Sequence, residues 1–301
     1  MIDLKTRLRG IVTVLNTPFD RNDAVDLDAL SRHVEYAVHA GVRGFLVPAM
    51  ASEVETLTDI ERAAIVDRVV SVVDGAVPII GGASAREPAR RTEWARRVLD
   101  LGCDAALVAV PYHDDATWER DVRSLATAVE GPLMIQDWDA AGYGAPVALI
   151  ARLFSELERF VSIKIEVVPA GAKYSQVLAK TDGAIHVAGG WAVMQMIEAF
   201  DRGVDAIMPT ALHEIYLAID RAYRRGDRDG ARALFDRLLP ILAFSNQHLD
   251  ISILFFKRLL YRQGIYSTDR CRSPRLALDA VHRRIADELI DNALSMMEEL
   301  S

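Results

Sequence analysis

The chain has 301 residues, of which 51% are hydrophobic and 26% are charged, and its formal net charge is −8. This length and composition predict a compact globular protein of one large or two ordinary domains, and exclude a disordered or fibrous chain. The acidic balance, with no compensating cluster of Lys and Arg, argues against a nucleic-acid partner.

Two cysteines, Cys103 and Cys271, are too few to indicate a disulfide framework or a zinc site. The N-terminal sequence lacks the apolar stretch of a secretory leader, and no apolar run approaches the roughly 18 residues that span a bilayer. We therefore expect a cytoplasmic protein without a membrane partner.

Eight short apolar runs, rich in β-branched residues, alternate with amphipathic segments whose apolar residues recur at three and four. The predicted strands span residues 10–16, 44–49, 77–82, 105–110, 132–136, 160–165, 184–190 and 205–210. Strands that alternate with helices predict a parallel sheet, and eight repeats favour a (β/α)8 barrel over an open doubly wound sheet. No G-x-G-x-x-G motif follows the first strand, which argues against a dinucleotide site.

After about residue 212 the strand pattern stops, and helical patterns continue to the end of the sequence. We predict a barrel over residues 1–225 and a C-terminal helical extension over residues 226–301. No linker rich in Pro, Gly or Ser separates the two, so we expect the extension to pack on the barrel as part of one structural unit.

The sixth predicted strand contains a lysine and a glutamate in the sequence VSIKIEVV. Lys164 is flanked by isoleucines, so it points to the opposite face of the strand from them, and Glu166 lies on the same face as Lys164. Burial penalises an ammonium, which favours the neutral amine that can attack a carbonyl and form a Schiff base. The alternative is a buried ion pair without a catalytic role.

Several segments together resemble the dihydrodipicolinate synthase and N-acetylneuraminate lyase family. They are GIVTVLNTPFD, ASEVETLTDIER, VPYH, the lysine of the sixth strand, and AGGWAVMQMIEAFDRGVDAIMPT. The resemblance implies a (β/α)8 barrel with C-terminal helices that forms a homo-oligomer, a tetramer or a dimer. It also implies a lyase that acts on a small-molecule 2-keto acid through a lysine imine, with no metal or other cofactor, and Lys164 is that lysine by position.

The sequence departs from the common pattern of this family at two strand ends. After the second strand the family commonly reads GTTGE, whereas this chain has Ala51, Ser52 and Glu53 in the corresponding segment. At the end of the fifth strand the family commonly has a Tyr-Asn pair, and this chain has Gln136 and Asp137. The QD, KIE and SE motifs resemble the 2-keto-3-deoxy-L-arabonate dehydratase branch more closely.

The resemblance implies dehydration or aldol cleavage of a 2-keto-3-deoxy sugar acid. In this mechanism Lys164 forms the imine, and Glu166 or Tyr112 moves protons. The residues expected to bind substrate are Ala51, Ser52, Glu53, Gln136, Asp137, Gly189 and Gly190. Ser52 would hold the substrate carboxylate, although it could equally be a helix N-cap, and the glycines would let the backbone approach the substrate closely.

Two other functions remain open at this point. A metal-dependent barrel lyase could use Asp137 and Glu166 as oxygen ligands for Mg²⁺. A barrel that binds a keto acid without converting it is also possible, because the tyrosine of the family is missing and a fold does not guarantee chemistry.

Overall fold

The computed structural model describes residues 3–272, 274, 276 and 278–300. Eight strands form a closed barrel in chain order, and the last strand pairs in parallel with the first. The strands are β1 Gly10–Val14, β2 Gly44–Val47, β3 Ile79–Gly82, β4 Ala105–Ala109, β5 Leu133–Asp139, β6 Phe160–Val167, β7 His186–Gly189 and β8 Ala206–Ile207. Each overlaps a predicted strand, so the (β/α)8 barrel is confirmed.

Helices α2 to α9 follow the strands as the amphipathic segments predict, α1 precedes β1, and α10 to α12 come after the last strand and its helix. They are α1 Leu4–Arg7, α2 Leu27–Ala40, α3 Asp59–Val73, α4 Pro88–Asp100, α5 Asp115–Ala128, α6 Val147–Glu156, α7 Ala170–Lys180, α8 Met196–Asp201, α9 His213–Arg224, α10 Arg228–Ser245, α11 Leu249–Arg262 and α12 Ala280–Leu300. Local chemistry fixes their ends: Thr58 and Glu61 form a reciprocal capping box at the start of α3, and Gly41 ends α2 with a φ of 102°. Among the described residues, no helix is both long and apolar enough to cross a membrane.

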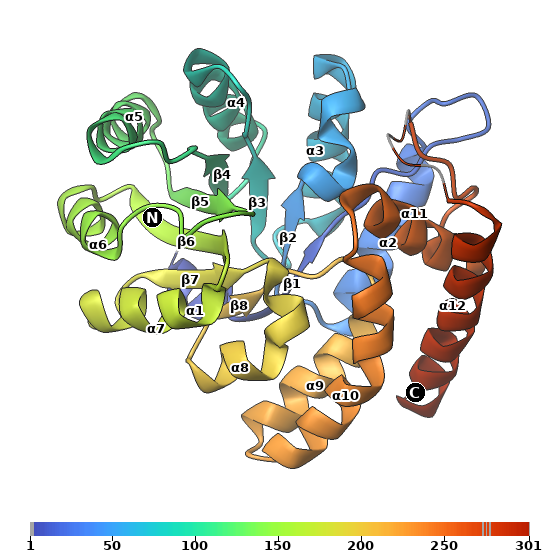
Figure 1. Cartoon of the computed structure of the whole chain (residues 1–301). Coiled ribbons are helices and arrows are strands. Elements are labelled where there is room, and N and C mark those ends of the chain that lie inside the picture. Colours follow the sequence, from blue (N-terminus) through green and yellow to red (C-terminus); the bar gives the residue numbers. More distant parts are fainter. Residues whose placement is uncertain (1–2, 273, 275, 277, 301) are drawn as a thin grey trace. The chain divides into compact units, whose positions relative to one another are not determined.

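The chain divides into two compact units. The first comprises the described residues up to Val12, Arg43–Leu46 and Val77–Met208. In this unit, helices α4 to α7 lie outside strands β3 to β7 (Figure 1). The expected division of the chain at residue 225 stays a prediction.

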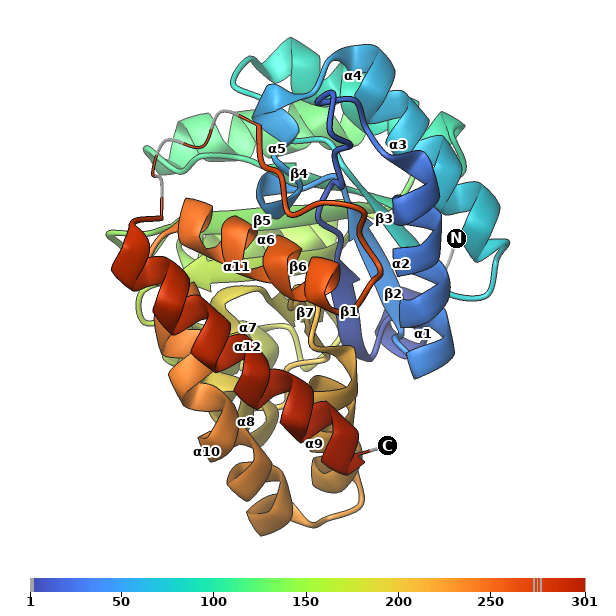
Figure 2. The same cartoon turned by 90° about the vertical axis from the view of Figure 1, so that its right-hand side faces the viewer.

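The second unit comprises Thr13–Val42, Val47–Ala76 and the described residues from Pro209 onward. It is helical, and it also contains three-residue 3-10 turns, η1 Met50–Ser52 and η2 Val54–Thr56. Within it α12 packs against α9 and α10, and α10 packs against α11 (Figure 2).

Strands β5 and β6 are longer than predicted, and this difference shapes the candidate site. The register of β4 with β5 ends at Gln136, and that of β6 with β7 ends at Ile165. Strands β5 and β6 continue beyond these points as a two-stranded ribbon, in which Trp138 pairs with Glu166 and Asp139 pairs with Val167. Asp137 and Asp139 in β5 and Glu166 in β6 interrupt the apolar runs, so the predicted strands end before the observed ones.

Candidate active site

A buried lysine and glutamate form the centre of the candidate site, on strand β6. Nζ of Lys164 lies 3.0 Å from Oε2 of Glu166, and the two side chains are only 7% and 11% exposed. Both leave the strand on the same face, as the alternation predicts. The arrangement places an amine in contact with a group that can accept or donate a proton.

Gln136 on the neighbouring strand completes this group. It is in register with Lys164, and its Nε2 donates a hydrogen bond to Oε2 of Glu166. The same carboxylate oxygen therefore faces both an amine and an amide, which fixes the orientation of Glu166. The sequence assigned Gln136 to substrate binding, which stays a prediction, but the structure shows a contact with Glu166 that was not expected.

Gly190 lies directly against the same pair. A Cβ atom at this position would come within 1.9 Å of Oε1 of Glu166 and 2.7 Å of Cε of Lys164. The φ of Gly190 is −90°, so the requirement for glycine is set by space and not by the backbone conformation. Gly189 ends β7 in register with Ile165, and its carbonyl accepts from Met208 N at 2.9 Å, so it belongs to the barrel ladder.

Asp137 points to the other face of strand β5. Its carboxylate forms a buried ion pair with Lys173 of α7 and accepts from Ala145 N at 3.0 Å. Burial raises the pKa of Asp137 and lowers the pKa of Lys173, while each partner opposes the shift of the other. Asp137 and Glu166 therefore lie on opposite faces of the ribbon, each paired with its own lysine, and do not converge on one ion as the magnesium hypothesis requires.

Tyr112 follows strand β4, and its side chain is half-buried. Its hydroxyl donates to Oδ1 of Asp115 at 2.6 Å, in the first turn of α5, and this hydrogen bond raises the pKa of Tyr112. In this arrangement the phenol proton is engaged in a hydrogen bond to Asp115. The role of Tyr112 as a proton relay stays a prediction.

Ala51, Ser52 and Glu53 belong to the second unit, where they form the turn after β2. The Ser52 hydroxyl donates to the Leu15 carbonyl and accepts from Ala49 N, and the Ala51 carbonyl accepts from Asn16 Nδ2 at 2.7 Å. The serine hydroxyl is thus used to hold the turn. Its contact with a substrate carboxylate stays a prediction.

Glu53 forms a second buried ion pair, with Lys257 of α11. Glu53 also accepts from Arg272 N at 2.7 Å, and the Lys257 amine lies 4.2 Å from the centre of the Phe19 ring. Burial raises the pKa of Glu53 and lowers that of Lys257. Sequence analysis did not identify this pair, although a lysine inside the apolar run SILFFKRLL was a usable signal.

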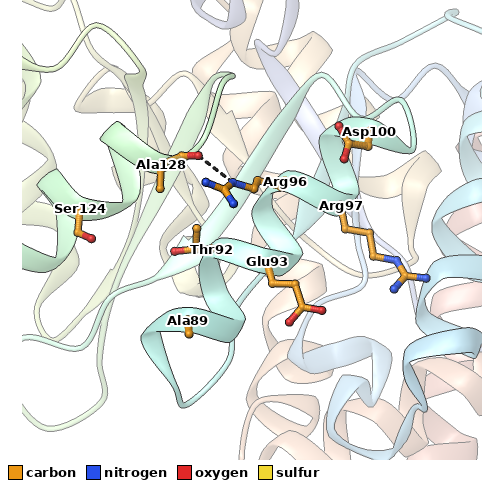
Figure 3. A pocket seen from close by; sticks show the side chains of 8 residues that line it. All are labelled: Ala89, Thr92, Glu93, Arg96, Arg97, Asp100, Ser124 and Ala128. Atoms are coloured by element: carbon orange, nitrogen blue, oxygen red, sulfur yellow. Dashed lines mark hydrogen bonds between the residues drawn. The ribbon is translucent and has the colours of Figure 1, made fainter.

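A groove of about 580 Å³ lies on the surface between α4 and α5 (Figure 3). Its lining residues are Ala89, Thr92, Glu93, Arg96, Arg97, Asp100, Ser124 and Ala128. Arg96 donates to the Ala128 carbonyl at 2.8 Å across the groove, and none of the predicted site residues lines it. Within the described part of the chain, no group of three or more His, Cys, Asp or Glu side chains could hold a metal ion.

Known proteins match nearly the whole of this chain. The chain is 29% identical over 296 residues to a 4-hydroxy-tetrahydrodipicolinate synthase of Xanthomonas axonopodis pv. citri, with 96% of each sequence covered. It is 27% identical over 297 residues to an L-2-keto-3-deoxyarabonate dehydratase of Azospirillum brasilense, which covers 93% of this chain and 95% of the relative.

Solved structures show the same fold. A dihydrodipicolinate synthase from Rhodopseudomonas palustris superposes with a TM-score of 0.87 at 21% identity, over 98% of this chain and 99% of the other. The family model described as the dihydrodipicolinate synthetase family matches residues 7–293. With nearly the whole chain matched, this protein belongs to the dihydrodipicolinate synthetase family.

Proposed function

We propose that this chain is a lyase that binds a 2-keto acid as an imine on Lys164 and then dehydrates or cleaves it. The observation that carries the proposal is the buried Lys164 amine, held 3.0 Å from the Glu166 carboxylate on a barrel strand. Active sites of such barrels lie at the C-terminal ends of the strands, where this pair is found. Membership of a family of synthases and lyases supports the general class of reaction.

Imine formation needs a neutral amine, and Glu166 is placed to accept the proton of Lys164. The free amine attacks C2 of the keto acid, and the carbinolamine loses its oxygen as water when Glu166 returns the proton. The C2–oxygen bond breaks and a C2–nitrogen double bond forms. Gln136, which donates to the same oxygen of Glu166, keeps the carboxylate directed at the amine throughout.

The protonated imine withdraws electrons from C3, so a base can remove a C3 proton and leave an enamine. The enamine then expels the C4 hydroxyl as water, which gives dehydration. Alternatively, the imine accepts the electrons of the C3–C4 bond while the C4 hydroxyl loses its proton, which gives aldol cleavage. Glu166 is the candidate acid and base for both routes because its Oε2 is already in contact with the reacting nitrogen.

A 2-keto-3-deoxy sugar acid is the substrate class that the residues favour. Gln136 stands where the family commonly has a tyrosine, and an amide cannot serve as an acid or base at neutral pH. The synthase reaction that relies on that tyrosine is therefore disfavoured. The dehydratase from Azospirillum brasilense, which covers nearly the whole chain, supports the sugar-acid alternative.

Intact-mass measurement after sodium borohydride reduction tests the proposal. The protein is incubated separately with pyruvate and with a 2-keto-3-deoxy sugar acid, reduced, and mapped by proteolysis, which is simple because the chain has only five lysines. We expect an adduct on Lys164 that disappears in Lys164→Ala and persists in the matched control Lys180→Ala, at an exposed lysine of α7. An adduct on another lysine, or none, contradicts the imine mechanism.

A barrel that binds a keto acid without converting it is the second candidate. The observation in its favour is that the Tyr112 hydroxyl is occupied by Asp115, while Gln136 replaces the family tyrosine. Saturable binding of a sugar acid, measured by calorimetry, with no borohydride adduct and no product would support this candidate. Formation of a dehydrated or cleaved product would remove it.

A further inference from the structure

The ribbon formed by β5 and β6 carries an exposed aromatic residue that no step of the proposed mechanism uses. Trp138 is 47% exposed, whereas every other residue of strand β5 is buried or half-buried. Small-molecule sites are lined mostly by hydrophobic and aromatic side chains, with a few polar groups that fix the orientation of the ligand.

The direction of the Trp138 side chain follows from its neighbours. Gln136 reaches Glu166, and Asp137 reaches Lys173 on the other face, so alternation returns Trp138 to the face of Gln136. Register gives the same answer, because Trp138 pairs with Glu166 and paired residues of adjacent strands share a face.

The register of β5 with β6 also gives the position of Trp138 along the strand relative to Lys164. Gln136 is level with Lys164, and Trp138 lies two residues further toward the C-terminal end, which is about 7 Å along the strand. The registers with β4 and β7 have already ended at this point. Trp138 therefore lies beyond Lys164, toward the C-terminal end of the ribbon that β5 and β6 form.

We infer that Trp138 is a specificity-determining residue, whose indole face packs against the distal carbon chain of a keto acid joined to Lys164. This inference rests on the proposed function. Indole rings combine a broad apolar face with one N–H donor, which suits the C–H face and hydroxyl edge of a polyhydroxylated chain. Pyruvate ends one carbon beyond the imine carbon and is too short to reach this height, whereas a five- or six-carbon acid extends toward it.

Borohydride trapping with two acids of different length tests the inference. The concentration that gives half-maximal adduct on Lys164 is measured for pyruvate and for a 2-keto-3-deoxy sugar acid, in the wild type, Trp138→Ala and Trp138→Phe. We expect Trp138→Ala to raise this concentration about tenfold for the sugar acid and to leave it unchanged for pyruvate. Trp138→Phe, which keeps an aromatic face, should recover part of the loss.

Tyr261→Ala is the matched control, because Tyr261 is an aromatic of similar exposure, 45%, on helix α11. Equal half-maximal concentrations for the sugar acid in the wild type and Trp138→Ala would overturn the inference while leaving the imine mechanism intact. A smaller assembly in sedimentation with unchanged half-maximal concentrations would overturn it in favour of an interface between copies. No adduct in the wild type with either acid would overturn the mechanism and the inference together.

Discussion

Lowering the pH from 7 to 5 should destabilise the folded chain through two fully buried histidines in the second unit. His33 of α2 and His213 of α9 are stacked, with their Nε2 atoms 3.3 Å apart. Tyr266 donates its hydroxyl to the Asn16 carbonyl at 2.8 Å, so it accepts from Nδ1 of His33 at 2.9 Å. With both imidazoles neutral, Nε2 of His33 accepts from Nε2 of His213, whose Nδ1 accepts from the Thr13 hydroxyl at 3.3 Å. Two charged rings cannot form this chain of hydrogen bonds, because both Nε2 atoms would then be donors.

The sign and size of the effect follow from the pKa shifts. Burial lowers the pKa of His213 to about 3, and burial with the neighbouring imidazole lowers the pKa of His33 well below its ordinary value. Below about pH 6.5 the unfolded chain therefore binds protons that the folded chain does not, and stability falls as the pH falls. Each histidine contributes a loss of about 2 kcal/mol between pH 7 and pH 5, or about 4 kcal/mol together.

Urea unfolding followed by circular dichroism at pH 7, 6 and 5 measures this loss. Glu53 and Asp137 have raised pKa values, so their protonation acts in the opposite sense as the pH falls. The diagnostic quantity is therefore the difference between proteins: His33→Phe should lose about 2 kcal/mol less than the wild type between pH 7 and 5. His39→Gln, at an exposed position of α2, should match the wild type. An equal pH dependence in the wild type and His33→Phe would refute the reasoning.

Three further outcomes are expected. Gly190→Ala should slow adduct formation about 100-fold, since a Cβ 1.9 Å from Oε1 must displace Glu166; an unchanged trapping rate, measured by intact mass, would contradict the close approach. Lys257→Met should lower the free energy of unfolding by about 3–5 kcal/mol, because it leaves the Glu53 carboxylate buried without its lysine. The double variant Lys257→Met with Glu53→Gln should lose less of this free energy, and urea unfolding compares the two proteins. Turnover of a sugar acid should survive prolonged dialysis against a chelator, and complete, metal-reversible loss would revive the magnesium hypothesis.

The sequence predicted the eight strands because a barrel strand is buried on both faces, and such strands are visible as runs of apolar residues. Alternation then placed Lys164 and Glu166 on one face, and their contact at 3.0 Å confirms that placement. The prediction was weaker at the ends of β5 and β6, where Asp137 and Asp139 in β5 and Glu166 in β6 interrupt the apolar pattern although the strands continue. The predicted strands therefore end where the apolar pattern changes, whereas the observed strands continue further.

Pairing between distant segments was the part that the sequence could not supply. Glu53 and Lys257 are separated by 204 residues, and nothing local to either residue identifies the other. The assignment of Asp137 to substrate binding stays a prediction, and its ion pair with Lys173, on the opposite face of β5 from Gln136, was not expected from the sequence. Its partner Lys173 lies on α7, and only the folding of the chain brings the two charges together.

If Lys164 forms the imine as proposed, the ribbon of β5 and β6 offers a way to change the substrate without moving the lysine. Lys164 and Glu166 lie on β6, while the residues that face them, Gln136 and Trp138, lie on β5. Paired residues share a face, so a change on β5 alters the surroundings of the imine without moving the lysine. The Gln136 amide cannot relay a proton, but it donates to Glu166, the group to which the proposed mechanism gives the acid–base work. Under the proposed mechanism we therefore expect substitutions on the fifth strand to change the trapping of acids longer than pyruvate more than the trapping of pyruvate itself.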